Sequence, residues 1–400
     1  MRLKNASILA IQVYLVSKCV ADPLGPQHEV TGIPTILRQE VEQRGIISFA
    51  RFMEVALYCP KMGYYESTAG QVGRHGDFYT NVSVGPVFGE LLARRCVEWL
   101  EALGPGPLHL VEAGAHDGQL ALDILNWLAA HRPALSSRIA YWLIEPSVDR
   151  QNCQRLKLEN FSSRVECFAG WAGIPKEGVR GVIFSNELLD AFPVHRLRWD
   201  ASQRCWSEWG VGWDGYRFVW RRMPSEREED WQAHLVQAGF ELPPELLSVL
   251  PDGFTLELSP AATTWWSEAA KALRIGKLLT FDYGWTALEH LDPARGSGTL
   301  RGYSGHRLQE DVLAKPGEQD LTAHVNFTQL QLAGERAGLR TVTLTEQSRF
   351  LSRIAAEVLS ERDEGDTKGW SPEQVRQFQT LVHPGQLGRA FRVLVQERLP

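Results

Sequence analysis

Three polar side chains follow an apolar run that has the composition of a buried strand. The run is residues 181–184, and the side chains after it are Asn186, Glu187 and Asp190. Such an acidic cluster can hold a cation such as a guanidinium, because carboxylates pair with its planar N–H groups. The two acids would share one face if the segment were helical, although Pro193 limits that helix to about a turn. A short capped helix with a solvated acidic face fits the same pattern.

A glycine-containing turn is the second candidate site. Residues 108–111 predict a buried strand that stops at Glu112, and the turn that follows leads into a helix. This arrangement holds nucleotide-like ligands, since glycine admits close backbone approach and the helix N-terminus offers N–H groups. The spacing E-x-G-x-H-x-G differs from G-x-G-x-x-G and is closer to turns that bind S-adenosylmethionine (SAM). An ordinary strand–helix connection also fits. The candidates for cofactor binding here are Glu112, Gly114, His116 and Gly118.

Three further strand ends carry polar or aromatic candidates. An apolar run ends in Glu145, where an acid can accept both hydroxyls of a ribose. Gly170 and Trp171 follow the next predicted strand, and the tryptophan either stacks on an adenine or packs in the core. Asp282 ends a later buried strand. Because ligands of open α/β sheets bind outside the carboxyl ends of the strands, we expect these positions to share one cleft.

Two loops supply the remaining candidates. Residues 73–80 combine glycines and polar side chains with two aromatics, so the segment either folds over a ligand or is a connection pinned to the core. Residues 299–325 are predicted as one long loop, and its aromatic and histidine content argues against disorder. With Asp282, the candidates for substrate binding are Asp77, Phe78 and Tyr79 in the first loop and His324 in the second.

The elements around these sites follow from hydrophobic periodicity. Helices are predicted at 35–43, 48–58 and 87–103. Alternation over 194–222 predicts an antiparallel meander rich in tryptophan. Such aromatics usually pack one face of a sheet, whereas a platform for single-stranded nucleic acid would need interleaved positive charge. The C-terminal remainder is predicted to be helical with a final strand at 391–396.

Composition excludes several classes of protein. With 44% hydrophobic and 22% charged residues, the 400-residue chain is expected to be a soluble globular protein. The net charge of −6 and the lack of a basic tract argue against a nucleic-acid partner. The apolar stretch at 8–16 is too short to span a membrane. Six scattered cysteines without a CxxC motif predict neither a metal site nor a disulfide framework, and they favour a reducing, cytoplasmic location.

Five stretches in this order resemble the MidA family of SAM-dependent methyltransferases, which includes an arginine-methylating assembly factor of mitochondrial complex I. They are 63–65, 76–80 with 88–90, 112–123, 186–193, and 282–284 with 316–327. The resemblance implies an α/β, Rossmann-like, seven-stranded methyltransferase fold with an N-terminal helical cap and a β-rich insertion. The expected divisions are an extension and linker at 1–32, a cap and lid loop at 33–104, and a methyltransferase domain at 105–400 with the insertion at 194–250.

The same resemblance implies SAM as the cofactor and an arginine of a protein substrate as the methyl acceptor. Glu187 and Asp190 would orient the guanidinium beside Asn186 in the catalytic site, and a homodimer is compatible with the sequence. This chain departs from the family at His116, where glycine is common, and at Asn326, where an acid is common. His116 favours the alternative of a non-catalytic assembly protein. A methyltransferase acting on small molecules or nucleic acid is a third interpretation.

Overall fold

The computed structural model describes residues 32–67, 80–224, 230–305, 307–360 and 370–400. The chain divides into two compact units, each drawn from three segments of sequence. We call them the α/β unit and the meander unit. The α/β unit takes residues 73–188, 266–284 and 333–400, and the meander unit takes 1–72, 189–265 and 285–332. The candidates Asp77, Phe78 and Tyr79 lie outside the described residues.

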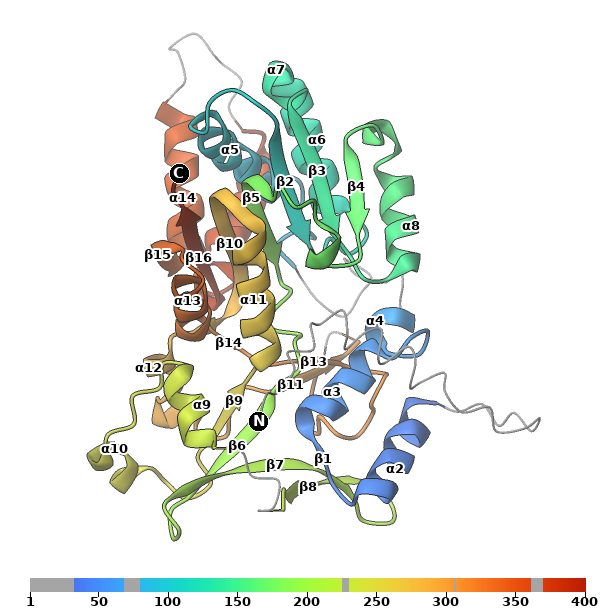
Figure 1. The fold of residues 1–400 in the computed structure, drawn as a ribbon, viewed down its shortest axis with the longest axis vertical. Coiled ribbons are helices and arrows are strands. Elements are labelled where there is room, and N and C mark those ends of the chain that lie inside the picture. Colours follow the sequence, from blue (N-terminus) through green and yellow to red (C-terminus); the bar gives the residue numbers. More distant parts are fainter. Residues whose placement is uncertain (1–31, 68–79, 225–229, 306, 361–369) are drawn as a thin grey trace, which may run out of the picture. The chain divides into compact units, whose positions relative to one another are not determined.

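Seven strands of an eight-stranded sheet form the centre of the α/β unit (Figure 1). They follow in the order β15-β16-β10-β5-β2-β3-β4, and the whole sheet has one strand more than the predicted seven. The strands from β10 to β4 are parallel, and β16 is antiparallel to both neighbours. This is the Rossmann-like α/β arrangement predicted from the sequence. The strands are β2 (Leu108–Ala113), β3 (Ile139–Ile144), β4 (Val165–Phe168), β5 (Val179–Asn186), β10 (Leu273–Trp285), β15 (Arg340–Glu346) and β16 (Phe391–Arg398).

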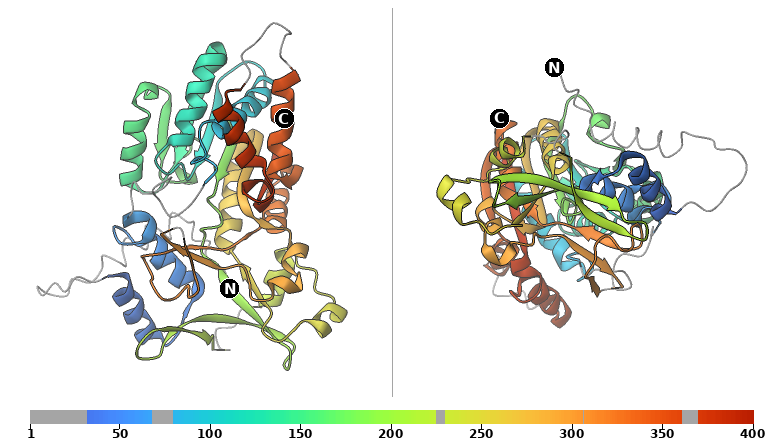
Figure 2. Two further views of the ribbon diagram at one scale, coloured as in Figure 1. Left: turned by 180° about the vertical axis from the view of Figure 1, so that it is seen from behind. Right: turned by 90° about the horizontal axis from the view of Figure 1, so that it is seen from below.

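Helices cover this sheet and supply most of the core. The helices of the unit are α5 (Val87–Glu101), α6 (Gln119–His131), α7 (Pro133–Ser136), α8 (Val148–Lys157), α14 (Gln347–Ser360), α15 (Pro372–Val382) and α16 (Leu387–Ala390), with 3-10 turns η1 (Glu159–Phe161) and η2 (Trp171–Gly173). Helix α5 packs against α6, and the C-terminal helices α14 and α15 pack against α5 (Figure 2). Each large apolar side chain buried there contributes about 1.5–3 kcal/mol. This packing fixes the start of α6 beside the end of β2.

The register of the parallel strands brings the predicted sites to one edge. Ala113 at the end of β2 pairs with Ile144 of β3 and with Ser185 of β5. Glu145 and Glu187 therefore follow neighbouring strands on either side of β2. Parallel strands end at the same edge of a sheet, and the sequence-based expectation that these strand ends converge is confirmed.

The meander unit contains the predicted antiparallel strands. Its five-stranded sheet runs β1-β7-β6-β9, with β8 paired to β7, and α2 and α3 pack against it. Ser48 caps α3 as predicted, accepting a hydrogen bond from the backbone of Arg51. The elements are α2 (Ile33–Arg44), β1 (Ile47–Ser48), α3 (Phe49–Tyr58), α4 (Tyr64–Ser67), β6 (His195–Asp200), β7 (Cys205–Trp213), β8 (Phe218–Arg222), α9 (Trp231–Gln237), α10 (Pro244–Val249), β9 (Thr255–Leu258), α12 (Ala287–His290), η4 (Pro293–Arg295), β11 (Arg301–Ser304), β12 (Arg307–Gln309), β13 (Asp320–Thr322) and β14 (Val325–Asn326).

Two helices cross the division of the chain, α11 (Pro260–Ala272) and α13 (Phe327–Arg336). The compact units also differ from the predicted domains. The predicted cap at 33–104 is divided, because α5 packs in the core of the α/β unit. The insertion extends beyond 194–250, since β9 completes the meander sheet by pairing with β6. Within the described residues, no helix is both long and apolar enough to cross a membrane.

Two secondary-structure predictions were wrong. The segment 299–325 contains a three-stranded antiparallel sheet, β12-β11-β13, rather than one long loop. Its strands are only three or four residues long, too short to give a periodic signal. Residues 340–346 form the edge strand β15 instead of a helix, because pairing with β16 supplies hydrogen bonds that local sequence does not reveal.

Candidate active site

The turn after β2 has an unusual backbone that suits a closely held ligand. Gly114, His116 and Gly118 all have positive φ, at 72°, 48° and 86°. A Cβ atom on Gly114 would lie 2.8 Å from Cδ1 of Leu188, so a side chain at this position would have to displace the end of Leu188. Gly118 then forms the N-cap of α6. A left-handed turn leading into a helix is the kind of backbone cradle that binds anionic groups.

The backbone at position 116 has a conformation that glycine adopts more easily than histidine. This left-handed conformation disfavours most residues with a Cβ atom, although histidine is one of those found there more often. The ring Nδ1 lies 3.8 Å from Oδ1 of Asp117, and Lys157 donates to the same carboxylate. Partial burial alone would raise the pKa of Asp117, but its interactions with His116 and Lys157 lower that pKa. The histidine thus belongs to a charged cluster at the turn.

Glu112 is buried directly before this turn. Only 3% of its surface is exposed, and the hydroxyl of Tyr141 donates to its carboxylate. Burial raises the pKa of Glu112 to about 8, while the tyrosine hydrogen bond opposes that rise. The side chain is therefore neutral in the free protein below that pH. Glu112 lies near the end of its strand, as the sequence predicted. Its contact with Tyr141 was not predicted.

Replacing Glu112 with glutamine is expected to change the pH dependence of stability. The folded protein holds a proton on Glu112 up to about pH 8, whereas the unfolded chain releases it near the ordinary value of 4.5. Stability from this group is therefore lost as pH rises through that window. Between pH 5 and 8 the wild type should lose about 3 kcal/mol more than Glu112→Gln. Urea unfolding without ligand measures this, with exposed Glu177→Gln as the control. Parallel curves for wild type and Glu112→Gln would contradict it.

Glu145 is held in a fixed position after β3. The residue is 3% exposed, and its carboxylate accepts hydrogen bonds from the backbone of Ser147 at 3.0 Å and from Gln154 at 3.4 Å. Gln154 also donates to the carbonyl of His116 at 2.8 Å, which connects this acid to the glycine turn. The next strand is followed by Gly170 and the half-buried Trp171, at the start of η2. These residues remain proposed contacts for the cofactor.

Glu187 follows β5 in a strained backbone conformation. Its φ is 51°, and its amide donates to the carbonyl of Phe281 on β10 at 2.9 Å. The carboxylate Oε1 accepts from Nδ2 of Asn186 and from the backbone N–H of Asn81, both at 2.9 Å. Left-handed geometry at a non-glycine residue costs about 1–3 kcal/mol and is concentrated at functional sites. The segment after Glu187 is a turn, so the short helix that the sequence allowed after β5 is absent.

Asn81 organises this corner, and the sequence analysis did not identify it. The side chain is fully buried, and its Nδ2 donates a hydrogen bond of 2.9 Å to Oδ1 of Asn186. It also forms a reciprocal amide pair with Gln347, with distances of 3.0 and 2.8 Å. Asn81 immediately follows the 76–80 motif, but nothing local to that sequence indicates a partner 266 residues away. Asn81 therefore fixes the positions of both Asn186 and Glu187.

Asn81→Ala is expected to destabilise the protein by about 3 kcal/mol, because it removes a hydrogen-bond partner from the buried amide of Gln347 and from the half-buried amide of Asn186. Thermal or urea unfolding measures the loss. The double variant Asn81→Ala/Gln347→Ala should cost less than the two single changes together, since the pair is coupled. Additive losses would show that the two amides do not depend on each other.

The other predicted site residues have separate surroundings. Asp282 is fully buried and accepts from the backbone of Leu188 at 3.2 Å, so it supports the turn that carries Glu187. Asp190 and His324 belong to the meander unit. Burial lowers the pKa of His324 to about 3, and its ring packs edge-on against Trp285 at 4.0 Å. His324 is therefore a neutral, packed histidine in this unit.

The sheet order, the left-handed turn after its central strand and the acid beyond the neighbouring strand define a Rossmann-like enzyme that binds a nucleoside cofactor. A family model described as "Putative S-adenosyl-L-methionine-dependent methyltransferase" matches residues 91–345, and the chain belongs to this family. Its cofactor is SAM, and its class of reaction is methyl transfer. The left-handed backbone at Gly114 and Gly118 and the start of α6 fit that cofactor, because such a turn presents backbone N–H groups to a ligand.

Individual relatives agree with this assignment. A protein from Burkholderia thailandensis, crystallised with S-adenosyl-homocysteine, is 31% identical, with 92% of each chain covered and a TM-score of 0.77. The "Protein arginine methyltransferase NDUFAF7, mitochondrial" of Xenopus laevis is 27% identical, covering 88% of this chain and 81% of that protein. Its human counterpart is 26% identical, with 91% and 83% covered.

These relatives contradict the prediction of a cytoplasmic location, because the curated relatives are named as mitochondrial proteins. The prediction depended on six scattered cysteines. Unpaired cysteines indicate a reducing environment, but they do not distinguish one reducing compartment from another.

Proposed function

We propose that the protein transfers a methyl group from SAM to a guanidinium nitrogen of an arginine in a protein substrate. The observation that carries the proposal is the contact between the two strand-end turns. Leu188, next to Glu187, occupies the space over Gly114. Glu187 thus lies in the turn whose next residue packs against the glycine turn. The names of the curated relatives support arginine as the acceptor.

We assign cofactor binding to the glycine turn and to Glu145, with the ribose hydroxyls as the ligands of that acid. Gly170 and Trp171 would border the adenine. SAM supplies an electrophilic methyl group on a sulfonium. No strong base is needed to begin the transfer, so most of the acceleration comes from positioning the acceptor nitrogen. Two hydrogen bonds already hold one carboxylate oxygen of Glu187 in place.

Glu187 would pair with the guanidinium and keep its reacting nitrogen oriented. The N–CH3 bond forms as the S–CH3 bond breaks, the sulfonium becomes a neutral thioether, and the guanidinium loses one proton. We assign that proton to Glu187. Within the α/β unit, Asn186 fixes this carboxylate and Asp282 supports the turn that carries it, while Asp77, Phe78 and Tyr79 stay sequence-based candidates for substrate contacts.

The decisive experiment combines methyl-labelled SAM, the purified protein and a mitochondrial protein extract. We expect label in methylarginine after complete hydrolysis of the protein fraction. Label on lysine, on nucleic acid or on small molecules would refute arginine as the acceptor. SAM binding by calorimetry without any labelled product would favour the assembly protein that His116 suggested.

A further inference from the structure

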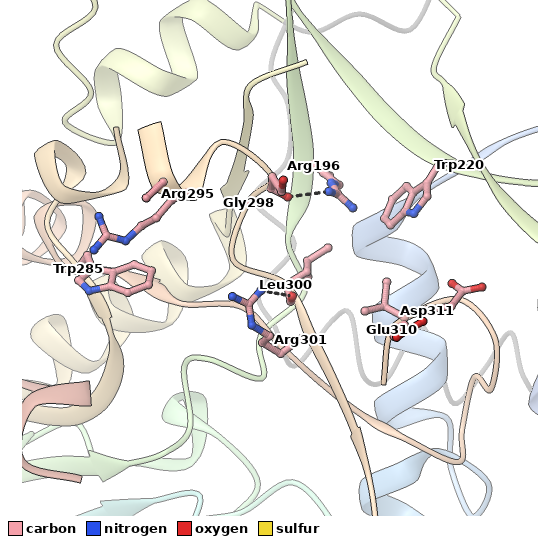
Figure 3. Close-up of a pocket in the computed structure, with 12 residues that line it drawn as sticks. Arg196, Trp220, Trp285, Arg295, Gly298, Leu300, Arg301, Glu310 and Asp311 are labelled. Atoms are coloured by element: carbon pink, nitrogen blue, oxygen red, sulfur yellow. Dashed lines mark hydrogen bonds between the residues drawn. The ribbon is translucent and has the colours of Figure 1, made fainter. Parts of the chain in front are cut away.

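A hollow of about 320 Å³ in the meander unit is lined by Arg196, Arg295 and Arg301 (Figure 3). Acids of the same unit balance these guanidinium groups. Arg295 pairs with Asp292 at 2.9 Å, and the buried Glu257 lies 3.9 Å from Arg196. Burial raises the pKa of Glu257, and the charges of Arg196 and Arg301 oppose that rise. The described residues around the hollow therefore offer a ligand no excess of positive charge.

One face of helix α8, in the α/β unit, lies against both parts of the proposed cofactor site. Gln151, Gln154 and Lys157 are spaced three residues apart, so they share this face. Gln151 donates to the backbone carbonyl of Glu145 at 2.7 Å. Lys157 donates to the carboxylate of Asp117, which belongs to the glycine turn. Gln154 lies between these two contacts along the helix.

The side chain of Gln154 contacts both parts of the site with a single amide group. It is fully buried, and its Nε2 donates to the carbonyl of His116 at 2.8 Å and to Oε2 of Glu145 at 3.4 Å. A glutamine amide has two N–H donors, so these two acceptors use both of them. Its Cγ also lies 3.6 Å from the place where a Cβ atom on Gly118 would be. Gln154 therefore fixes the carboxylate of Glu145 relative to the backbone of the glycine turn.

The neighbours of this amide determine its orientation. Both partners of Nε2 are oxygen acceptors, so a rotated amide would place its own oxygen against a carbonyl and a carboxylate. The oxygen Oε1 is buried and receives no hydrogen bond from the described residues. A buried acceptor without a donor is destabilising. The fold therefore maintains the position of the N–H donors at the expense of the oxygen.

We propose that Gln154 is a positioning residue for the cofactor, and that its amide holds the Glu145 carboxylate in the orientation that receives the ribose hydroxyls. The proposal depends on the assignment of Glu145 to the ribose. The backbone of Ser147 holds Oε1 of this carboxylate at 3.0 Å, and Gln154 holds Oε2. Each oxygen keeps a lone pair for a hydroxyl donor. Because the protein itself fixes both oxygens, little side-chain freedom remains to be lost when the ribose binds.

The test compares two ligands by calorimetry, S-adenosyl-homocysteine and an analogue of it that lacks both ribose hydroxyls. The wild type should bind the first about a hundredfold more tightly. Gln154→Leu removes the N–H donors at similar size, so it should bind S-adenosyl-homocysteine about tenfold more weakly and the analogue within about twofold of wild type. General damage to the site would weaken both ligands equally. The matched control is Gln377→Leu, since Gln377 is a buried glutamine of α15 whose amide contacts the backbone of Val87. It should bind both ligands like wild type.

Gln154→Glu keeps the shape of the side chain and replaces the donor nitrogen by an oxygen. Burial and the charge of Glu145 raise the pKa of the new carboxyl group, and only its protonated form can donate. The affinity of this variant for S-adenosyl-homocysteine, relative to wild type, should therefore rise about tenfold as pH falls from about 8 to about 6. The charged groups His116, Asp117, Glu145 and Lys157 are present in both proteins, so the ratio removes their own titration.

Equal weakening of both ligands in Gln154→Leu, or a pH-independent affinity ratio for Gln154→Glu, would overturn the proposal. Glu145→Ala tests the assignment on which it depends. If that variant keeps the wild-type preference for the ribose hydroxyls, Glu145 does not bind the ribose and the role of Gln154 fails with it. If Glu145→Ala loses the preference and Gln154→Leu keeps it, only the role of Gln154 is refuted. The identity of the methyl acceptor affects none of these measurements.

Discussion

Gly114→Val is expected to lose SAM binding, with Kd raised at least about a hundredfold. The added side chain meets Cδ1 of Leu188 at 2.8 Å, and the backbone φ of 72° is itself unfavourable for valine. Either the turn moves or Leu188 is displaced, and both outcomes change the surface against which we place the cofactor. Isothermal calorimetry with SAM measures the loss directly.

Gly104→Val separates this steric effect from backbone strain. Gly104 has nearly the same φ, 77°, but a Cβ atom there would have no atom within 4 Å. Both variants should lose about 1–2 kcal/mol of stability from left-handed geometry, and only Gly114→Val should lose affinity. Unchanged SAM affinity in Gly114→Val would mean that the cofactor lies elsewhere.

Glu187→Gln is expected to reduce kcat/KM for the protein substrate at least about a thousandfold while SAM affinity stays within about tenfold. Glutamine can present its amide oxygen in place of Oε1, so the hydrogen bonds from Asn81 and Asn186 are retained. The change therefore removes the negative charge and keeps these two hydrogen bonds. The acceptor guanidinium loses its charged partner and the proton loses its proposed acceptor.

Turnover with methyl-labelled SAM, together with calorimetry on the same preparation, measures both quantities. Glu166→Gln is the matched control, because it removes an exposed acid from β4 of the same sheet. Comparable turnover in Glu187→Gln and wild type would exclude the proposed role of this carboxylate. A parallel loss of SAM affinity would instead assign Glu187 to the cofactor.

Several parts of this protein followed from local sequence. Apolar runs identified β2, β3 and β5, and the glycine turn predicted the start of α6, because each of these depends on neighbouring residues. Alternation also predicted the strands of the meander. The short strands of 299–325 and the edge strand β15 were missed, since their pairing partners define them.

Some features of the candidate site were likewise predicted from local sequence, and others were not. Glu112, Glu145 and Glu187 were selected because each follows a predicted parallel strand, and parallel strands end together. The positive φ of His116 and Glu187 could not be predicted, because both residue types usually adopt right-handed or extended backbone. The surrounding fold holds them in that conformation.

The sequence by itself determined the α/β class, the cofactor turn and the acids at neighbouring strand ends, because hydrophobic periodicity and glycine placement are local properties. Only the tertiary structure decided how those acids are held and charged. Asn81 reaches Asn186 and Gln347 across long stretches of chain, and burial changes the proton affinity of Glu112. Hydrogen-bond partners and desolvation depend on which distant segments pack together, and no local pattern encodes that packing.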